Sequence, residues 1–342
     1  MNIQNIESYP YKLNFIHPFI TAKGLYEHRD GFIIKIYSDS YIGLGEVAPL
    51  ENFHKESLQE CYYALEAINQ TLSGTLGINQ SELFQIFKLH AESMPSLLFG
   101  LETAALDILS QKSCVPISKY INEKSKSTLK LNGVHGIHNE KQFEIVKVKL
   151  GYNNIYDDIE ILDKLTMEYP KNVKFRVDVN EQLDLVKAIR FCKSIEKFNI
   201  DYIEQPLPAD HLKDLCELRM HTNIKIAVDE SITNYESAYQ IIENQSADVF
   251  VIKPMLVGSY ADTNKIIEMA KNEDVGCVIT NMLDGAINRM SCIHLALSSN
   301  ISRECGLSMD GLFRDDLALT PKIKQGQISI FKTPGLGISI ND

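Results

Sequence analysis

FRVDVN (residues 175–180) ends an apolar run with charge, and three later runs repeat this pattern: YIEQP (202–206), IAVDES (226–231) and FVIKP (250–254). The charged residues follow one another at intervals of 26, 25 and 24 residues; they are Asp178, Glu204, Asp229 and Lys253. One strand, one helix and two loops take about this many residues, so the spacing predicts one charged group per β/α unit. Parallel strands closed into a barrel would gather these groups at one mouth, at the C-terminal ends of the strands.

Strand-like runs along the second part of the chain indicate an α/β fold. We identify eight of them, at 129–134, 145–150, 173–178, 200–204, 224–229, 248–253, 275–280 and 304–307. Helical segments such as 182–197 and 235–244 lie between most of these runs. We therefore expect a (β/α)8-type, TIM-like barrel over residues 125–318, with irregularity in its last units.

The first part of the chain does not repeat β/α units. Residues 2–15 and 31–47 read as strands of a small antiparallel meander, and helical stretches follow near 55–73, 80–92 and 97–112. This pattern predicts an α+β capping domain over residues 1–120. The tail, 319–342, carries two short β-like pieces, and we expect it to join the capping domain.

Composition narrows the class of protein. The 342 residues are 44% hydrophobic and 23% charged, which is ordinary for a soluble globular protein. The net charge of −11 argues against a nucleic-acid partner, because phosphate binding needs clustered positive charge. No apolar stretch approaches the roughly 20 residues of a membrane-spanning helix, and the N-terminus does not resemble a signal peptide. Seven scattered cysteines without a CxxC pair fit reduced thiols, so we expect a cytoplasmic protein.

The three acids of the spaced pattern suit a divalent cation. Asp178, Glu204 and Asp229 would present oxygen ligands from adjacent strands, which is the donor type that Mg²⁺ prefers, with Mn²⁺ as the alternative. Asn180 and Glu230 would contact these ligands and hold them in place without binding the cation themselves. The alternative is that each acid caps the following helix or pairs with a local lysine. Three acids in register, with a lysine one unit later, favour the metal site.

The lysines point to proton transfer. Residues two apart in a strand share a face, so Lys147 and Lys149 point the same way, and Val146 and Val148 take the face that meets the helices. Lysines inside a barrel are unfavourable unless they serve a function. A neighbouring like charge and a cation would lower the pKa of such a lysine from about 10.4, which makes it a usable base. Lys253, about four strands away, would face Lys149 across the barrel.

A metal between two opposed lysines suits removal of a proton from the carbon next to a carboxylate. The cation would stabilise the enediolate while one lysine takes the proton. This combination is the one described for enolase-type sites.

Several motifs together resemble the enolase superfamily, and within it the muconate-lactonizing-enzyme subgroup: KVK, RVDVN, IEQP, VDES and VIKPMLVG. Three N-terminal segments are most similar to the capping domain of o-succinylbenzoate synthases: YPYKLNFIHPFITAKG, GLGEVAPLENFHKESL and LLFGLETAALDIL. The resemblance implies that Lys149 is the principal acid/base, that Lys147 tunes its charge, and that Lys253 acts from the opposite face. It implies a small-molecule carboxylate as substrate and is compatible with a homo-oligomer.

The resemblance favours dehydration of a cyclohexadiene carboxylate to o-succinylbenzoate, a step of menaquinone synthesis. The alternative is an isomerase: a dipeptide epimerase, an N-acylamino acid racemase or a cycloisomerase. Two segments depart from the synthase pattern, around Thr280–Asp284 and Ser308–Asp310. The resemblance also implies that capping loops at 18–24 and 50–54 close over the substrate. The candidate substrate-binding residues are therefore Phe19, Lys23, Phe53, Thr280, Asn281, Met282, Ser308, Met309 and Asp310.

Overall fold

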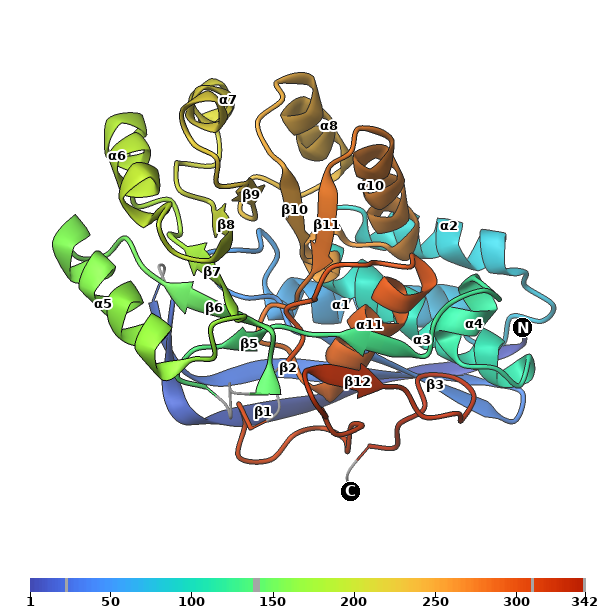
Figure 1. Cartoon of the computed structure of the whole chain (residues 1–342). Helices are drawn as coiled ribbons and strands as arrows, with labels where there is room; N and C mark the ends of the chain where they lie inside the picture. Colours follow the sequence, from blue (N-terminus) through green and yellow to red (C-terminus); the bar gives the residue numbers. More distant parts are fainter. Residues whose placement is uncertain (22–23, 138–141, 309–310, 341–342) are drawn as a thin grey trace.

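The computed structural model describes residues 1–21, 24–137, 142–308 and 311–340. Its N-terminal part is an antiparallel sheet in the order β1-β2-β3, packed against three helices (Figure 1). The strands are β1 (Ile3–Thr21), β2 (Gly24–Ser38) and β3 (Tyr41–Val47), and the helices are α1 (Leu58–Leu72), α2 (Gln80–Ala91) and α3 (Pro95–Lys112). This is the predicted α+β arrangement, but β2 begins seven residues before the predicted strand at 31.

The second part of the chain is a parallel sheet in the order β11-β10-β9-β8-β7-β6-β5, with helices along its outer side (Figure 1). Its strands are β5 (Gly133–Val134), β6 (Ile145–Lys149), β7 (Lys174–Asp178), β8 (Ile200–Glu204), β9 (Ile226–Val228), β10 (Val249–Ile252) and β11 (Gly276–Ile279). Its helices are α5 (Ile155–Glu168), α6 (Leu185–Ile195), α7 (Leu212–His221), α8 (Tyr235–Glu243), α9 (Pro254–Val257), α10 (Tyr260–Asn272) and α11 (Ala286–Ser298). The predicted barrel-type α/β fold is confirmed.

The predicted eighth strand, at 304–307, is not a strand in the described residues. Single bridges take its place: Cys305 pairs with Leu131, and Gly306 pairs with Thr280. These two bridges join the last part of the barrel to the first. The predicted first strand, at 129–134, is also divided, because its beginning pairs elsewhere: β4 (Thr128–Lys130) forms an antiparallel ladder with β12 (Gln327–Ser329) of the tail.

The tail also reaches the helices of the N-terminal part. The Leu336 amide donates to the Asp107 carboxylate on α3 at 2.8 Å, and the Ile117 amide of α4 (Ile117–Ile121) donates to the Gly335 carbonyl at 3.0 Å. The tail thus contacts both parts of the chain. The division at residues 1–120 and 125–318 stays a prediction.

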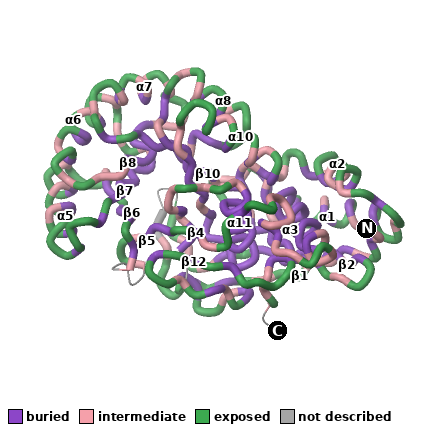
Figure 2. Tube along the Cα trace, turned by 45° about the vertical axis from the view of Figure 1, so that its right-hand side comes forward, coloured by how far each residue is buried: buried purple, intermediate pink, exposed green. Residues whose placement is uncertain are grey.

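Alternation along the strands separates a helix-facing side from an interior side. On β6, Val146 and Val148 are buried at 0% and 3% exposure and pack among the residues of the helix-covered core. A separate apolar cluster fills the barrel interior: Tyr202, Ala227, Val249, Val251 and Val278. Burial follows the barrel strands and helices α3 and α11, whereas the outer helices α5 to α8 carry many exposed residues (Figure 2).

Side-chain caps mark where four of the outer helices begin: α5, α6, α8 and α10. Asn154, Asp184, Asn234 and Ser259 each accept a hydrogen bond from a backbone amide in the first turn of the helix that follows. Such caps satisfy amides that have no partner within the helix. The chain therefore turns into each helix a few residues after the strand, and the strand ends remain at the barrel mouth.

Two glycines bring the N-terminal sheet close to helix α3. A Cβ at Gly43 would lie 2.0 Å from the Ala104 carbonyl oxygen, and one at Gly45 would lie 2.1 Å from that of Gly100. Only glycine permits this approach of two backbones. It fixes β3, and with it Glu46, against the rest of the molecule.

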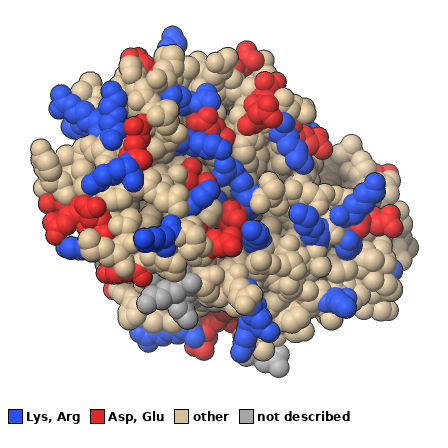
Figure 3. Space-filling view, viewed as in Figure 1, with Lys and Arg blue, Asp and Glu red and all other residues tan. Residues whose placement is uncertain are grey.

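On the face seen in Figure 3, Lys and Arg side chains are interspersed with Asp and Glu.

Within the described part of the chain, no helix combines the length and apolar character needed to cross a membrane.

Candidate active site

A cavity lies at the C-terminal ends of the barrel strands, between the barrel and the N-terminal part. Its charged lining residues are Lys147, Lys149, Asp178, Glu181, Asp229, Glu230 and Lys253, and its other polar lining residues are Asn132, Asn180, Thr280 and Asn281. Its apolar lining residues are Phe19, Leu50, Phe53, Val134, Ile137, Met282 and Leu283. The barrel thus supplies the charge, and the described residues of the N-terminal part supply apolar side chains.

The register of the strands brings the charged residues together. Lys149 on β6 lies opposite Asp178 on β7, which in turn lies opposite Glu204 on β8. Asp229 follows the end of β9, and Lys253 follows the end of β10. The sequence placed one charged residue at each strand end, and the parallel register sets these residues side by side.

Lys147 lies between two of the acids. Its Nζ is 2.8 Å from the Asp178 carboxylate and 2.7 Å from that of Glu204. Although burial lowers the pKa of Lys147, these carboxylates raise it well above its ordinary value. Burial raises the pKa of Asp178, but Lys147 and Lys149 outweigh this effect and lower it. Lys147 and Asp178 therefore form a buried ion pair.

The buried acids have oxygens that no protein group satisfies. Glu204 Oε2, Asp229 Oδ1 and Glu230 Oε2 are buried without a hydrogen-bond partner within the described residues. Burial also raises the pKa of Glu204 to about 8 and that of Glu230 to about 7. Buried carboxylate oxygens without partners are unfavourable unless positive charge lies nearby, so this donor set fits a hard cation.

In the described residues, no three acidic, histidine or cysteine side chains lie together in a way that could hold a metal ion in this arrangement. Instead, the Lys147 ammonium contacts two of the acids, and that of Lys253 contacts Asp229 at 2.5 Å. The oxygen donors are present, and ammonium groups balance their charge in this arrangement.

The two remaining lysines each face an aromatic ring from the N-terminal part. Lys149 Nζ lies 5.7 Å from the centroid of Phe19, and Lys253 Nζ lies 5.8 Å from that of Phe53. Burial lowers the pKa of Lys149. Burial also acts to lower the pKa of Lys253, but the carboxylates of Asp229 and Glu230 raise it above its ordinary value. The pKa values of the two lysines are therefore shifted in opposite directions, and Lys149 is the easier of the two to deprotonate.

Asn180 supports the acids from the loop after β7. Its side-chain amide donates to Glu230 at 3.0 Å, its backbone amide donates to Asp178 at 3.2 Å, and its side-chain oxygen accepts from the Tyr152 hydroxyl at 2.8 Å. Gln205 performs a similar task by accepting from the Asp229 amide at 2.9 Å. The sequence indicated Asn180 and Glu230 but not Tyr152 and Gln205, whose contacts appear only in the folded structure.

The predicted substrate-binding residues fall into three groups. Those that line the cavity are Phe19, Phe53, Thr280, Asn281 and Met282. Ser308 does not line it: this residue is buried, and its hydroxyl donates to the Asn132 carbonyl. Lys23, Met309 and Asp310 lie outside the described residues.

The described part of the predicted capping loop at 18–24 is strand rather than loop, although Phe19 within it does line the cavity. That this segment closes over the substrate stays a prediction. Phe19 pairs with Tyr26, and Thr21 pairs with Gly24, so these residues belong to the β1–β2 hairpin. The second capping segment, at 50–54, does lie outside regular secondary structure. Cavity residues that the sequence did not indicate, such as Ile137 and Leu283, are apolar and lie in loops, where no periodic pattern marks them.

Family models match both parts of the chain. One, described as "Enolase C-terminal domain-like", matches residues 134–342, and another, described as "MenC, N-terminal domain", matches residues 3–108. The first covers more than half of the chain. It includes every lysine and acid at the barrel mouth.

Relatives with several activities resemble the whole chain. An N-succinyl-L-Arg/Lys racemase from Bacillus cereus is 24% identical, covering 100% of this chain and 96% of its own. An o-succinylbenzoate synthase from Bacillus subtilis is 24% identical, covering 100% and 95%. The structure of a dipeptide epimerase from Enterococcus faecalis V583, complexed with Mg and the dipeptide L-Leu-L-Tyr, has a TM-score of 0.89 at 21% identity and covers 99% of this chain and 100% of its own. With the barrel fold and the matching C-terminal family, these similarities identify the chain as an enzyme of the enolase superfamily.

Proposed function

We propose that this protein is an isomerase, an epimerase or racemase of dipeptides or N-acylamino acids that moves the proton on the carbon next to the carboxylate. One observation carries the proposal: Lys149 on β6 and Lys253 after β10 line the same cavity, with Asp178 and Asp229 on the strands between them. Relatives named as a racemase and as epimerases support an isomerase over the dehydration that the sequence favoured.

The donor set supports Mg²⁺ as the cofactor, with Mn²⁺ as a substitute of similar ligand preference. Asp178, Glu204 and Asp229 would hold it, because two of them have buried oxygens without partners and Asp178 lies beside them in register. Asn180 and Glu230 would keep these carboxylates in place. A bound cation supplies positive charge to the substrate carboxylate, which makes the neighbouring carbon more acidic.

The lysines divide the proton transfer between two faces of the substrate. Lys149, whose pKa is lowered by burial, takes the proton from the α-carbon as a free amine. Lys253, held as an ammonium against Asp229, returns a proton to the opposite face. Removal at one face and return at the other inverts the carbon. Reversal of the two protonation states allows the same site to act on the other stereoisomer.

The cavity walls favour an apolar substrate side chain. The N-terminal part contributes Phe19, Leu50 and Phe53, and the loop after β11 contributes Met282 and Leu283. None of these carries the acid that a basic substrate side chain would need, and Glu181, an acid that also lines the cavity, already accepts a hydrogen bond from the Ala209 amide. We therefore expect a preference for Phe, Leu or Met over the Arg and Lys named for the Bacillus cereus relative.

Asn281 provides a donor for the rest of the substrate. Its Nδ2 is buried beside the cavity and has no hydrogen-bond partner within the described residues. A buried amide without a partner is unfavourable. An acyl or peptide carbonyl of the substrate would satisfy it.

Dehydration to o-succinylbenzoate is the second candidate. The N-terminal family model named for MenC and the Bacillus subtilis synthase favour it. In that reaction Lys149 would take the proton and assist departure of the hydroxyl, and Lys253 would act through its charge alone.

The test compares three probes with the Mg²⁺-loaded protein in D2O: N-succinyl-L-phenylalanine, the dipeptide L-Leu-L-Tyr and the cyclohexadiene carboxylate of the synthases. Proton NMR follows loss of the α-proton signal, and polarimetry follows inversion. An isomerase exchanges and inverts one of the first two probes and loses this activity in EDTA. Formation of o-succinylbenzoate without inversion of either amino-acid probe would establish the second candidate.

A further inference from the structure

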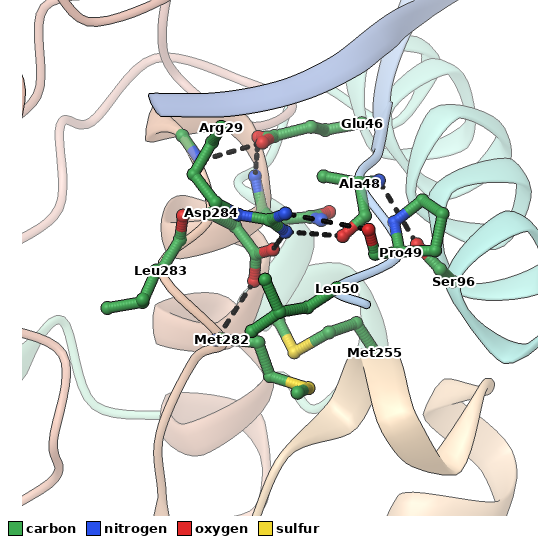
Figure 4. A network of polar contacts seen from close by, with 12 residues as sticks. Arg29, Glu46, Ala48, Pro49, Leu50, Ser96, Met255, Met282, Leu283 and Asp284 are labelled. Carbon is green, nitrogen blue, oxygen red and sulfur yellow. Dashed lines mark hydrogen bonds and ion pairs between the residues drawn. The ribbon is translucent and has the colours of Figure 1, made fainter. Parts of the chain in front are cut away.

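A second buried charge cluster lies behind the cavity wall, where the N-terminal part meets the barrel (Figure 4). It consists of Arg29 on β2, Glu46 on β3 and Asp284 in the loop between β11 and α11, which are 4%, 0% and 0% exposed. None of the three lines the cavity. The proton-transfer chemistry described above does not use them.

Arg29 binds two separate segments of the chain. Its Nη2 donates to the Ala48 carbonyl at 2.5 Å and its Nη1 to the Pro49 carbonyl at 3.5 Å, while its Nε donates to the Leu283 carbonyl at 3.1 Å. The first two carbonyls immediately precede Leu50, and the third belongs to a cavity residue. A guanidinium holds its donors in one rigid plane, so it fixes the distance between these segments.

The barrel segment is in a conformation that needs such support. Leu283 has a φ of +62°, in the left-handed region that a leucine seldom adopts. Asp284 accepts from the Met282 amide at 3.1 Å and lies 3.5 Å from Arg29 Nη2. Hydrogen bonds on both sides of Leu283 therefore stabilise the turn that directs Met282 and Leu283 toward the cavity.

Both segments are anchored at their far ends. Glu46 accepts hydrogen bonds from the Gly285 and Asn288 amides at 2.7 and 2.9 Å, which fixes the start of α11. On the other side, the Leu50 amide donates to His54 Nδ1 at 3.0 Å, and His54 Nε2 lies 3.2 Å from the Met255 carbonyl. The Ala48 amide also donates to the Ser96 hydroxyl at 3.1 Å (Figure 4), and between these fixed points Arg29 joins the capping segment to the loop after β11.

From these contacts we propose that Arg29 is a positioning residue of the active site. Its guanidinium sets the separation between two cavity walls, Leu50 on one side and Met282 with Leu283 on the other. That separation determines how well the cavity fits an apolar substrate side chain. The inference rests on the proposed function for its substrate class, whereas the mechanical link between the two segments does not depend on it.

The test replaces Arg29 by lysine, which keeps the positive charge but loses the planar set of N–H donors that contacts both segments. Arg219→Lys is the matched control, because Arg219 makes a similar fork to Asp248, at 3.1 and 2.5 Å, at the opposite end of β10. With N-succinyl-L-phenylalanine as the probe, Arg29→Lys should raise KM about tenfold and leave kcat within about threefold. Arg219→Lys should leave both constants unchanged.

Amide hydrogen exchange supplies a readout without substrate. In Arg29→Lys, residues 48–54 and 280–285 should lose protection together, and in Arg219→Lys neither segment should change. Equal thermal destabilisation of the two variants, with KM unchanged and no joint loss of protection, would overturn the proposal.

Asp284→Asn is the milder variant if Arg29→Lys does not fold, and it should shift KM in the same direction. If the wild-type protein exchanges no α-proton of any probe, the proposed function fails, and the hydrogen-exchange result alone decides whether Arg29 links the walls.

Discussion

Lys149 and Asp178 are direct cross-strand neighbours in the parallel register of β6 and β7. This pairing places the proposed base one strand away from the first proposed metal ligand. A substrate carboxylate held near Asp178 therefore has its α-carbon within reach of the lysine. The two roles are fixed relative to each other by backbone hydrogen bonds rather than by flexible loops.

Replacement of Lys149 by alanine should abolish α-proton exchange from every probe. A general base contributes about 10²- to 10⁴-fold to the rate, and the neighbouring amine, that of Lys147, is held by Asp178 and Glu204. Proton NMR in D2O measures the loss directly. Lys187→Ala, on the exposed side of α6, is the control and should retain full exchange. Residual inversion by Lys149→Ala above about a tenth of the wild-type rate would contradict the assignment.

Replacement of Lys253 by arginine separates the two candidate reactions. Arginine keeps the positive charge but does not release a proton near neutral pH. An isomerase should lose inversion by about 10²-fold or more, while Lys149 still exchanges the α-proton of one stereoisomer. A synthase should retain much of its dehydration, because charge suffices there. Chiral chromatography combined with NMR distinguishes inversion from exchange; full inversion in this variant would rule out proton return by Lys253.

Replacement of Lys147 by methionine should destabilise the protein most strongly when no divalent cation is present. The change leaves Asp178 and Glu204 close together without the ammonium between them, and removing one partner of a largely buried ion pair costs about 3 kcal/mol. Thermal melting in EDTA should show a lowered Tm, and added Mg²⁺ should restore more stability to this variant than to the wild type. Lys164→Met, which breaks an exposed pair with Glu160 on α5, is the control and should change little. Equal responses of both variants to Mg²⁺ would argue against a cation at these acids.

Replacement of Glu102 by glutamine should flatten the pH dependence of stability. Burial raises the pKa of Glu102 in the folded protein to about 8, whereas an unfolded glutamate titrates near 4.3. The folded state therefore holds the proton that the unfolded state releases, and this contribution is lost as the pH rises from about 4.3 to 8, by at most about 1.4 kcal/mol per unit. Urea unfolding at several pH values measures the difference between variant and wild type. Glu243→Gln, at an exposed site, should follow the wild-type profile.

The sequence predicted the lysines and acids at the barrel mouth because local rules determine where these residues lie. A strand has a period of two, and only one of its faces can meet the helices, so Val146 and Val148 imply that Lys147 and Lys149 point inward. Regular spacing then assigns Asp178, Glu204, Asp229 and Lys253 to successive strand ends. No knowledge of distant contacts is needed for these steps.

The walls of the site depend on contacts that the sequence does not display. Arg29 and Asp284 are 255 residues apart, and neither stands in a recognisable pattern. The prediction of an eighth strand was wrong for a similar reason. Among the described residues, Cys305 and Gly306 each form a single bridge, to Leu131 and Thr280, so this segment does not form a continuous strand ladder. Ser308 was placed in the cavity by resemblance, but its hydroxyl is used by the Asn132 carbonyl instead.

The hydrogen bonds between Glu46 and the start of α11 join an early part of the chain to a part that is synthesised late. The carboxylate belongs to a strand near the N-terminus, and the amides it accepts from lie 239 and 242 residues later. A nascent N-terminal sheet therefore carries an acid that has the Tyr11 hydroxyl as a partner but whose two partner amides have not yet been made, and contacts across such separations form late in folding. The N-terminal part is for this reason a poor candidate for expression by itself, and the barrel without it would keep the Asp316 carboxylate on the Ala286 amide but lose Glu46 at the start of its last helix.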